Sequence, residues 1–134
     1  MRPATRADAA SIIVMARRFH EQELTTEFCA ARVREVILSL IDGGGVFITS
    51  RGFIAGMAMQ NVSDKELTAH EVLWWAEDGR GADLRKAFEN WAHDVGCSAV
   101  EMSHPSQKKA VGRLLGRAGY TPQTDIYRKV LPCA

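Results

Sequence analysis

Two helices are predicted in the first third of the chain, because apolar residues recur there at helical spacing. The first should run from about residue 6 to 22, after a polar helix start at residues 5–8. The second repeats the pattern over residues 33–41 and should stop at Gly43, the first of three consecutive glycines. Consecutive glycines lose too much backbone entropy on folding to remain helical.

Three strands should follow, because residues 46–50, 53–62 and 66–76 are rich in apolar and β-branched side chains. The link Arg51-Gly52 suits a tight hairpin between the first two strands. The third strand should pair antiparallel with the second. Its unbroken apolar run at residues 72–75 indicates burial on both faces near its end.

The second half of the chain alternates helices and strands. From Leu84 the apolar positions follow the i, i+3, i+4, i+7, i+8, i+11 spacing of an amphipathic helix, which Gly96 should end. A strand at residues 98–103, a helix at 110–118 and a closing strand at 125–131 complete the series. The prediction is one domain over residues 1–134, of α/β (α+β) class, with a largely antiparallel sheet flanked by about four helices.

Composition narrows the kinds of partner. Seventeen basic and sixteen acidic residues are scattered along the chain and leave a formal charge of +1, which argues against a nucleic acid as the main partner. The apolar stretches are short and interrupted by charge, so neither a membrane span nor export is expected, and the cytoplasm is the default compartment. Cys29, Cys97 and Cys133 lie far apart, and no histidine has ligand spacing, so we expect reduced thiols and no metal.

The segment with the strongest chemical signal is 74–84, where a buried strand should pass through a glycine-bearing loop into a helix. Glycines let the backbone approach a ligand, and the first amides of a helix point outward at the positive end of its dipole, which suits a pyrophosphate. Gly79 and Gly81 could instead serve only to make a tight turn. A dinucleotide-binding loop would need a glycine at Leu84, and the Gly-Lys-Ser/Thr of a Walker loop is absent.

Four segments in order resemble the GNAT acetyltransferases. Residues 1–9 are similar to the family's first strand and helix start, and residues 46–57 to its second and third strands. Residues 79–84, with the helix up to Gly96, are similar to its pyrophosphate motif, and residues 114–120 to its Leu-Tyr-x-x-x-Gly-Phe segment. The small size and the double tryptophan are also similar to compact members encoded by bacteriophages.

Three positions depart from the family pattern. Ala76 stands where the pyrophosphate motif has glutamine or arginine, so the loop amides would have to hold the pyrophosphate without that side chain. Lys108 stands where many members have asparagine, and Leu115 replaces the tyrosine that often protonates the departing thiolate. The resemblance therefore leaves the general acid unidentified.

The resemblance implies acetyl-CoA as co-substrate. Its pantetheine arm would bond to the end of the fourth strand at Leu73, Trp74 and Trp75. The pyrophosphate would lie on a run of six residues that spans the loop and the helix start, with the Arg80 side chain as a possible charged partner: Gly79, Arg80, Gly81, Ala82, Asp83 and Leu84. A backbone amide near Trp74 or Trp75 would stabilise the tetrahedral oxyanion.

For the general base we choose Glu71, which lies just before the apolar run, where some family members carry a catalytic glutamate. A carboxylate beside tryptophans would have a raised pKa, although Glu71 could also be an ordinary strand residue facing solvent. His70 should point to the opposite face of the sheet. Ser103, His104 and Tyr127 are the alternatives for the acid, and a thiolate leaving group could also need none.

The function predicted from the resemblance is transfer of an acetyl group from acetyl-CoA to a primary amine, by direct attack of the amine. The acceptor could be a small molecule, a peptide N-terminus or a lysine side chain, and residues 25–30 and 103–109 could form its wall. The alternative is a degenerate GNAT-fold module that binds acyl-CoA or a protein partner without turnover. The sequence leaves the acyl-chain preference open, as well as the choice between monomer and homodimer.

Overall fold

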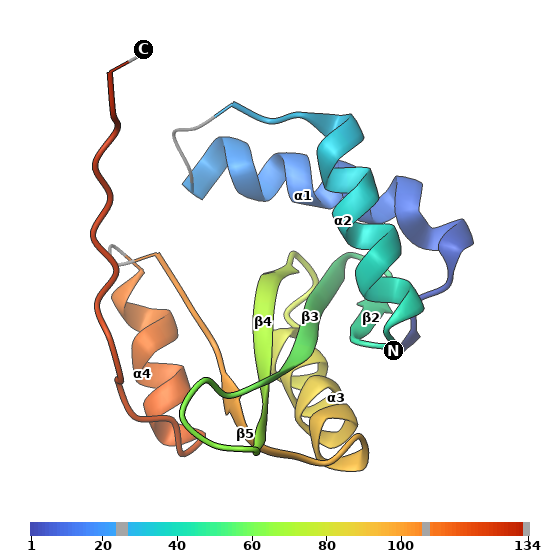
Figure 1. The fold of residues 1–134 in the computed structure, drawn as a ribbon. Coiled ribbons are helices and arrows are strands. Elements are labelled where there is room, and N and C mark those ends of the chain that lie inside the picture. Colours follow the sequence, from blue (N-terminus) through green and yellow to red (C-terminus); the bar gives the residue numbers. More distant parts are fainter. Residues whose placement is uncertain (24–26, 106–107, 133–134) are drawn as a thin grey trace. The chain divides into compact units, whose positions relative to one another are not determined.

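The computed structural model describes residues 1–23, 27–105 and 108–132, and these fall into two compact units, residues 1–103 and residues 104–134. The first unit holds the sheet and most of the helices (Figure 1). In chain order its elements are β1 (Arg2–Pro3), a 3-10 turn (Arg6–Asp8), α1 (Ala9–Glu23), α2 (Ala30–Asp42), β2 (Val46–Thr49), β3 (Gly52–Gln60), β4 (Leu67–Ala76), α3 (Gly81–Asp94) and β5 (Cys97–Glu101). The second unit holds α4 (Lys109–Arg117). The α/β class and the order of these elements are confirmed.

The predicted helix start at residues 5–8 is confirmed by its hydrogen bonds. The backbone N–H of Thr5 donates to Asp8 Oδ2 at 2.7 Å, which closes the first turn. Arg2 donates to both oxygens of the same carboxylate, at 2.7 and 2.8 Å, and this ion pair helps to hold the pKa of Asp8 well below its usual range. The N-terminal strand and the first helix are thereby joined.

The sheet has the strand order β1-β2-β3-β4-β5, with every neighbouring pair antiparallel except β4 and β5, which are parallel. The β2–β3 hairpin differs from its prediction by one residue. Thr49 pairs with Gly52, so the two-residue link is Ser50-Arg51 and Gly52 belongs to the strand. A Cβ on Gly52 would lie 2.9 Å from the Trp75 carbonyl oxygen, so this glycine permits close packing and does not make the turn.

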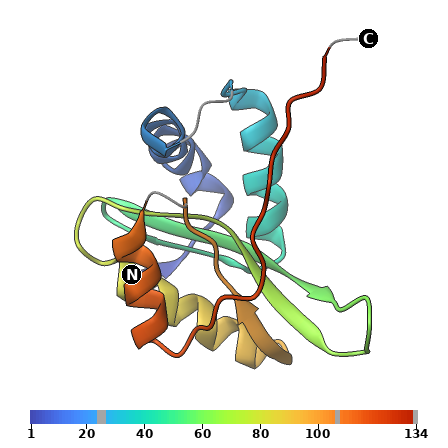
Figure 2. The same cartoon turned by 90° about the vertical axis from the view of Figure 1, so that its left-hand side faces the viewer.

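Helices cover both faces of the sheet, with α1 and α2 on one side and α3 on the other (Figure 2). The core beneath α1 and α2 includes Phe53 and Ala55, whereas the core beneath α3 includes Ile54 of the same strand. This division follows from the alternation of side chains along a strand. The two cores hold the sheet at a fixed position between its helices.

Strand β4 contains a β-bulge that the sequence did not predict. Ala55 pairs with Leu73 and Gly56 pairs with Glu71, so Val72 has no partner on β3. The extra residue reverses the alternation, because Ala69 packs on the α3 side whereas Leu73 packs on the side of α1 and α2. Val72 is 38% exposed. The prediction that residues 72–75 are buried on both faces is therefore only partly correct.

The two tryptophans after the bulge pack on opposite faces of the sheet. Trp74 lies against the α3 core and Trp75 against the core of α1 and α2, where its ring meets Phe19 edge-on at 5.9 Å between centroids. Each indole is half-buried. The end of β4 is thus fixed from both sides, which positions the loop that follows it.

The predicted closing strand at residues 125–131 is wrong, because residues 118–132 form neither helix nor strand. Ile126 and Tyr127 are each 90% exposed, and Val130 and Leu131 are 77% and 74% exposed. The apolar residues of this segment occur as adjacent pairs and not at every second position, so they define no single face that a sheet could bury.

The glycines that follow α2 provide a test of the packing. A Cβ on Gly45 would lie 2.2 Å from the Gly56 carbonyl oxygen, whereas a Cβ on Gly43 would meet nothing closer than 3.5 Å. Gly45→Ala should therefore lower the free energy of unfolding by about 2–3 kcal/mol, as overpacking against backbone does. Gly43→Ala should change it by no more than about 0.5 kcal/mol. Urea denaturation measures both, and equal effects of the two variants would contradict this packing.

Candidate active site

Strands β4 and β5 separate half-way along β4. Their parallel pairing runs from Leu67, opposite Cys97, to His70, opposite Glu101. Beyond this point β4 continues to pair with β3 at residue 71 and residues 73–76, but in the described part of the chain no strand pairs with the other edge of residues 71–76. The unpaired backbone groups along this edge are available to an extended ligand.

The direction of those backbone groups follows from the ladder with β3. The N–H of Glu77 donates to the Arg51 carbonyl oxygen at 2.9 Å, so residue 77 faces the hairpin. Backbone groups alternate along an antiparallel strand, so Trp75 also faces β3, whereas Trp74 and Ala76 face the open edge. Of the two residues predicted to supply an oxyanion donor, Trp74 is the one whose amide points outward.

Glu71 lies where the two strands separate, next to the bulge. Its cross-strand neighbour Gly56 faces α3, because a Cβ there would lie 2.4 Å from the ring of Phe88. Glu71 shares that face, since directly paired residues point to the same side of a sheet. His70 points to the other face, as predicted, and its Nδ1 lies 3.3 Å from Glu101 Oε2.

The carboxylate of Glu71 is held by Ser103. The Ser103 hydroxyl donates to Glu71 Oε2 at 3.0 Å, and the Ser103 backbone N–H donates to the same oxygen at 3.3 Å. Burial raises the pKa of Glu71 to about 7, although both hydrogen bonds act to lower it. A carboxyl group with this pKa can both accept and release a proton near neutral pH.

The other residues considered for the acid lie in the second unit. Tyr127 is exposed in the segment without helix or strand. The His104 ring packs beside α4, where Nε2 would lie 3.0 Å from a Cβ on Gly112, and its Nδ1 lies 2.8 Å from the Pro105 carbonyl oxygen. Leu115, which stands at the family's tyrosine position, is only 6% exposed and has no proton to give. A role for Tyr127 or His104 stays a prediction.

The loop between β4 and α3 is the segment predicted to act as an anion cradle, and its backbone geometry can now be described. Gly79 has φ +73°, a left-handed conformation that glycine adopts without strain. Arg80 is the N-cap of α3, and the first helical hydrogen bond runs from Leu84 N to Arg80 O at 3.1 Å. The amides of the first-turn residues are therefore not used within the helix: Gly81, Ala82 and Asp83. The Leu84 amide is used there, and its side chain is fully buried.

Hydrogen bonds and ion pairs fix the cradle. The Trp74 indole N–H donates to the Gly81 carbonyl oxygen at 3.1 Å, which ties the helix start to the strand. Arg80 Nε donates to Asp83 Oδ2 at 3.1 Å, so its guanidinium already has a carboxylate partner. An incoming phosphate would compete with Asp83 for Arg80.

The sequence analysis missed Glu77 and Asp78, whose carboxylates bond to the elements around the loop. The Trp75 indole and Arg18 lower the pKa of Glu77, and the Thr49 hydroxyl lowers that of Asp78, so both are ionised at neutral pH. The dipeptide Asp78-Gly79 is a usual turn signal and could have indicated a structural role.

An aromatic cluster lies at the end of α1, on the side where we expected the acceptor. The Phe28 ring meets His20 edge-on at 5.5 Å between centroids, and the Arg17 guanidinium lies 4.7 Å from the centre of the same ring. Of the predicted acceptor walls, residues 25–26 and 106–107 lie outside the described residues.

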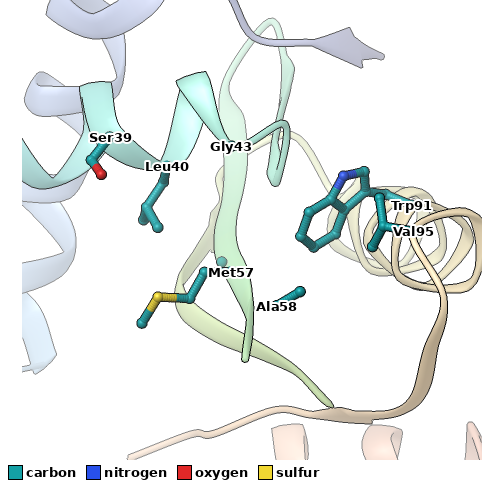
Figure 3. Close-up of a pocket in the computed structure, with 8 residues that line it drawn as sticks. Ser39, Leu40, Gly43, Met57, Ala58, Trp91 and Val95 are labelled. Atoms are coloured by element: carbon teal, nitrogen blue, oxygen red, sulfur yellow. The ribbon is translucent and has the colours of Figure 1, made fainter. Parts of the chain in front are cut away.

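A pocket of about 260 Å³ lies elsewhere, between α2, β3 and α3. Figure 3 shows Leu40 reaching it from α2, Trp91 from α3 and Val95 from just after α3, with Met57 on the strand between them. Its lining contains no titratable side chain, so it has no group that could move a proton.

The described residues offer no group of three His, Cys, Asp or Glu side chains that could hold a metal. Cys29 and Cys97 are free thiols, and Cys133 lies outside the described residues. None of the helices in residues 1–23, 27–105 and 108–132 has the length and hydropathy that crossing a bilayer requires.

Comparison with known proteins identifies the fold. Neither a family model nor a curated protein matches the sequence. The structure, however, superposes on an Arthrobacter sp. FB24 protein provisionally named an acetyltransferase, with a TM-score of 0.77 and 20% identity over 97% of this chain and 94% of that one. The fold is that of the GNAT acetyltransferases.

Two further solved structures with this fold carry the name acetyltransferase. The aminoglycoside acetyltransferase meta-AAC0020, from an uncultured soil sample, has a TM-score of 0.68 and 10% identity over 98% of this chain and 93% of its own. An acetyltransferase of Trypanosoma brucei has a TM-score of 0.66 and 11% identity over 96% of each chain. At these identities the likeness shows the fold.

The raised pKa of Glu71 predicts a change of stability with pH. Between pH 4.5, its ordinary value, and about pH 7, folded Glu71 keeps a proton that the unfolded chain releases. Its contribution to the free energy of unfolding should therefore fall as the pH rises through this range. The side chain of Glu71→Gln cannot titrate. The free energy of unfolding of this variant should therefore rise relative to that of the wild type between pH 4.5 and 7. Parallel curves from urea denaturation would contradict the raised pKa.

Proposed function

We propose that this protein is an N-acetyltransferase, which transfers the acetyl group of acetyl-CoA to a primary amine by direct attack. The observation that carries the proposal is Glu71, a carboxylate with a pKa of about 7, at the point where β4 and β5 separate. A general base works best when its pKa is near the working pH.

The donor would lie along the open edge of β4 and end at the start of α3. Trp74 offers outward backbone groups to the amides of the pantetheine arm. The first-turn amides at Gly81, Ala82 and Asp83 offer hydrogen bonds and the positive end of the helix dipole to the diphosphate. Ala76 contributes no polar side chain, so the backbone supplies most of the diphosphate contacts.

The reaction needs a neutral amine and a route for two protons. Glu71 takes a proton from the ammonium form of the acceptor, and the free amine attacks the thioester carbon to form the C–N bond. The carbonyl oxygen gains negative charge, which the outward Trp74 amide stabilises. When the C–S bond breaks, the sulfur leaves with the bonding electron pair and becomes a thiol by taking the second proton lost from nitrogen.

Ser103 is the best placed of the three candidate acids, because its hydroxyl already donates to Glu71. It can pass a proton between the Glu71 carboxyl group and the leaving sulfur. Tyr127 is the alternative acid from the second unit. A thiolate is a stable leaving group, so neither residue needs to be essential.

A small-molecule amine is the acceptor class we favour over a protein amine. The structural neighbours include an aminoglycoside acetyltransferase, solved in complex with sisomicin. We place the protein in the cytoplasm, where acetyl-CoA is available, and infer no nucleic-acid or membrane partner from its formal charge of +1. A binding module without turnover is the alternative that Leu115 and Ala76 favour.

Donor binding can be tested at Gly81. A Cβ there would lie 3.6 Å from Ala76 and Trp74, which is ordinary contact, so a side chain at this position is compatible with the fold. Gly81→Asp would place a negative charge beside the diphosphate and should weaken acetyl-CoA binding at least about tenfold more than the neutral Gly81→Asn does. Isothermal titration calorimetry measures both. Equal affinities of the two variants, or no binding by the wild type, would contradict the donor site.

The role of Glu71 can be tested by turnover. With saturating acetyl-CoA and a panel of amines, Glu71→Gln should lower kcat by about 10²- to 10⁴-fold and remove the limb of the pH–rate profile near pH 7. Glu101→Gln changes an exposed carboxylate on the neighbouring strand and should keep most of the activity. Release of free thiol is the readout. Donor binding without thiol release by the wild type would favour the binding module.

A further inference from the structure

The carboxylate of Asp78 joins the loop before α3 to the β2–β3 hairpin. Its Oδ2 accepts the Thr49 hydroxyl at 2.5 Å and the Arg51 backbone N–H at 3.1 Å. Its Oδ1 accepts the Arg80 backbone N–H at 3.2 Å. One side chain thus connects two segments that are far apart in the sequence and meet at the end of the sheet.

Among the partners of the Asp78 carboxylate, Thr49 is the one that is buried. Thr49 is 8% exposed, and its hydrogen bond is the largest cause of the lowered pKa of Asp78. The chain makes room for this contact at Gly52, where a Cβ would lie 3.0 Å from Thr49 Oγ1. The hairpin can therefore approach the end of β4 closely only with glycine at that position.

Glu77 holds the other side of the same loop. Its carboxylate accepts hydrogen bonds from the Trp75 indole at 3.1 Å, from Arg18 of α1 at 3.1 Å and from the Arg51 guanidinium at 3.0 Å. Asp78 differs from Glu77 in bonding to the backbone of the cradle itself, at Arg80. Changes at Asp78 should therefore reach the cradle most directly.

We propose that Asp78 and Thr49 are positioning residues for the donor, which hold the first-turn amides of α3 in the orientation that binds the diphosphate. The inference rests on the proposed donor site. The Asp78 carboxylate accepts the hydrogen bond of the Arg80 backbone N–H, so the amides of residues 81–83 are left for the ligand. Without this support the loop would adopt several orientations, and the donor would have to order it on binding, which weakens affinity.

The test uses Thr49, because it touches neither the donor nor the reacting atoms. Thr49→Val keeps the shape and removes the hydroxyl, whereas Thr49→Ser keeps the hydroxyl. Thr49→Val should raise the acetyl-CoA Kd about three- to tenfold, because only part of the lost hydrogen bond to the Asp78 carboxylate is transmitted to the donor site, and Thr49→Ser should restore most of that loss. The kcat at saturating donor should stay within about twofold for both variants, because the chemical step does not involve this residue.

A second readout needs no ligand. Thr49→Val should speed hydrogen exchange of the Arg80 amide in the free protein by a similar factor, because its acceptor is less firmly held. Asp64→Asn is the matched control, since Asp64 supports the β3–β4 turn in the same manner, through Asn61 at 3.0 Å and the Glu66 amide at 2.8 Å. It should leave both the Kd and the Arg80 exchange rate unchanged.

The two readouts separate this inference from the function on which it rests. If the wild type does not bind acetyl-CoA, the proposed donor site is wrong, and the exchange rates alone decide whether Thr49 and Asp78 hold the loop. If the wild type binds, and Thr49→Val changes neither the Kd nor the exchange of Arg80, the positioning role is overturned. A fall in kcat with an unchanged Kd would also overturn it.

Discussion

The candidate site depends on one feature of the sheet: β5 stops pairing with β4 at His70, although β4 continues to Ala76. Strand β4 pairs with β3 from Leu67 to Ala76 except at the bulged Val72, but β5 leaves it after the pair of His70 and Glu101. The remaining half of β4 has an open edge inside a sheet whose two faces are covered by helices. An extended ligand can satisfy those backbone groups while its ends reach Glu71 on one side and the start of α3 on the other.

The bulge at Val72 lets one strand serve both parts of the site. Before it, Glu71 lies on the α3 face beside Ser103; after it, the reversed alternation places Trp74 on the α3 face and Trp75 on the other. Each tryptophan then packs in a core and donates its indole N–H to the loop region, Trp74 to Gly81 and Trp75 to Glu77. Burial of Glu71 costs stability near neutral pH, and the same burial gives it a pKa suited to proton transfer.

Periodicity was enough to predict the helices and strands from α1 to β5, because these elements pack apolar side chains against a helix or the sheet, whereas β1 was expected only from the family resemblance. It failed at residues 125–131, where apolar residues come in adjacent pairs, and at Gly52, where a contact distant in sequence decides the role of a glycine. Glu71 was chosen through the family resemblance, and the direction of its pKa shift was expected from its apolar neighbours, but its hydrogen bonds from Ser103 could not be predicted because they depend on the fold. Glu77 and Asp78 were missed because their partners come from α1 and the hairpin.

We propose that the open edge of β4 and the start of α3 together form one donor site. The most direct measurement is a titration of the isotope-labelled protein with acetyl-CoA, followed by the amide resonances of individual residues. The largest changes should occur at Trp74 and at Gly81, Ala82 and Asp83, together with the Trp74 indole, which is bonded to Gly81. Changes confined to the pocket beside Met57 and Trp91, or no change at all, would contradict it.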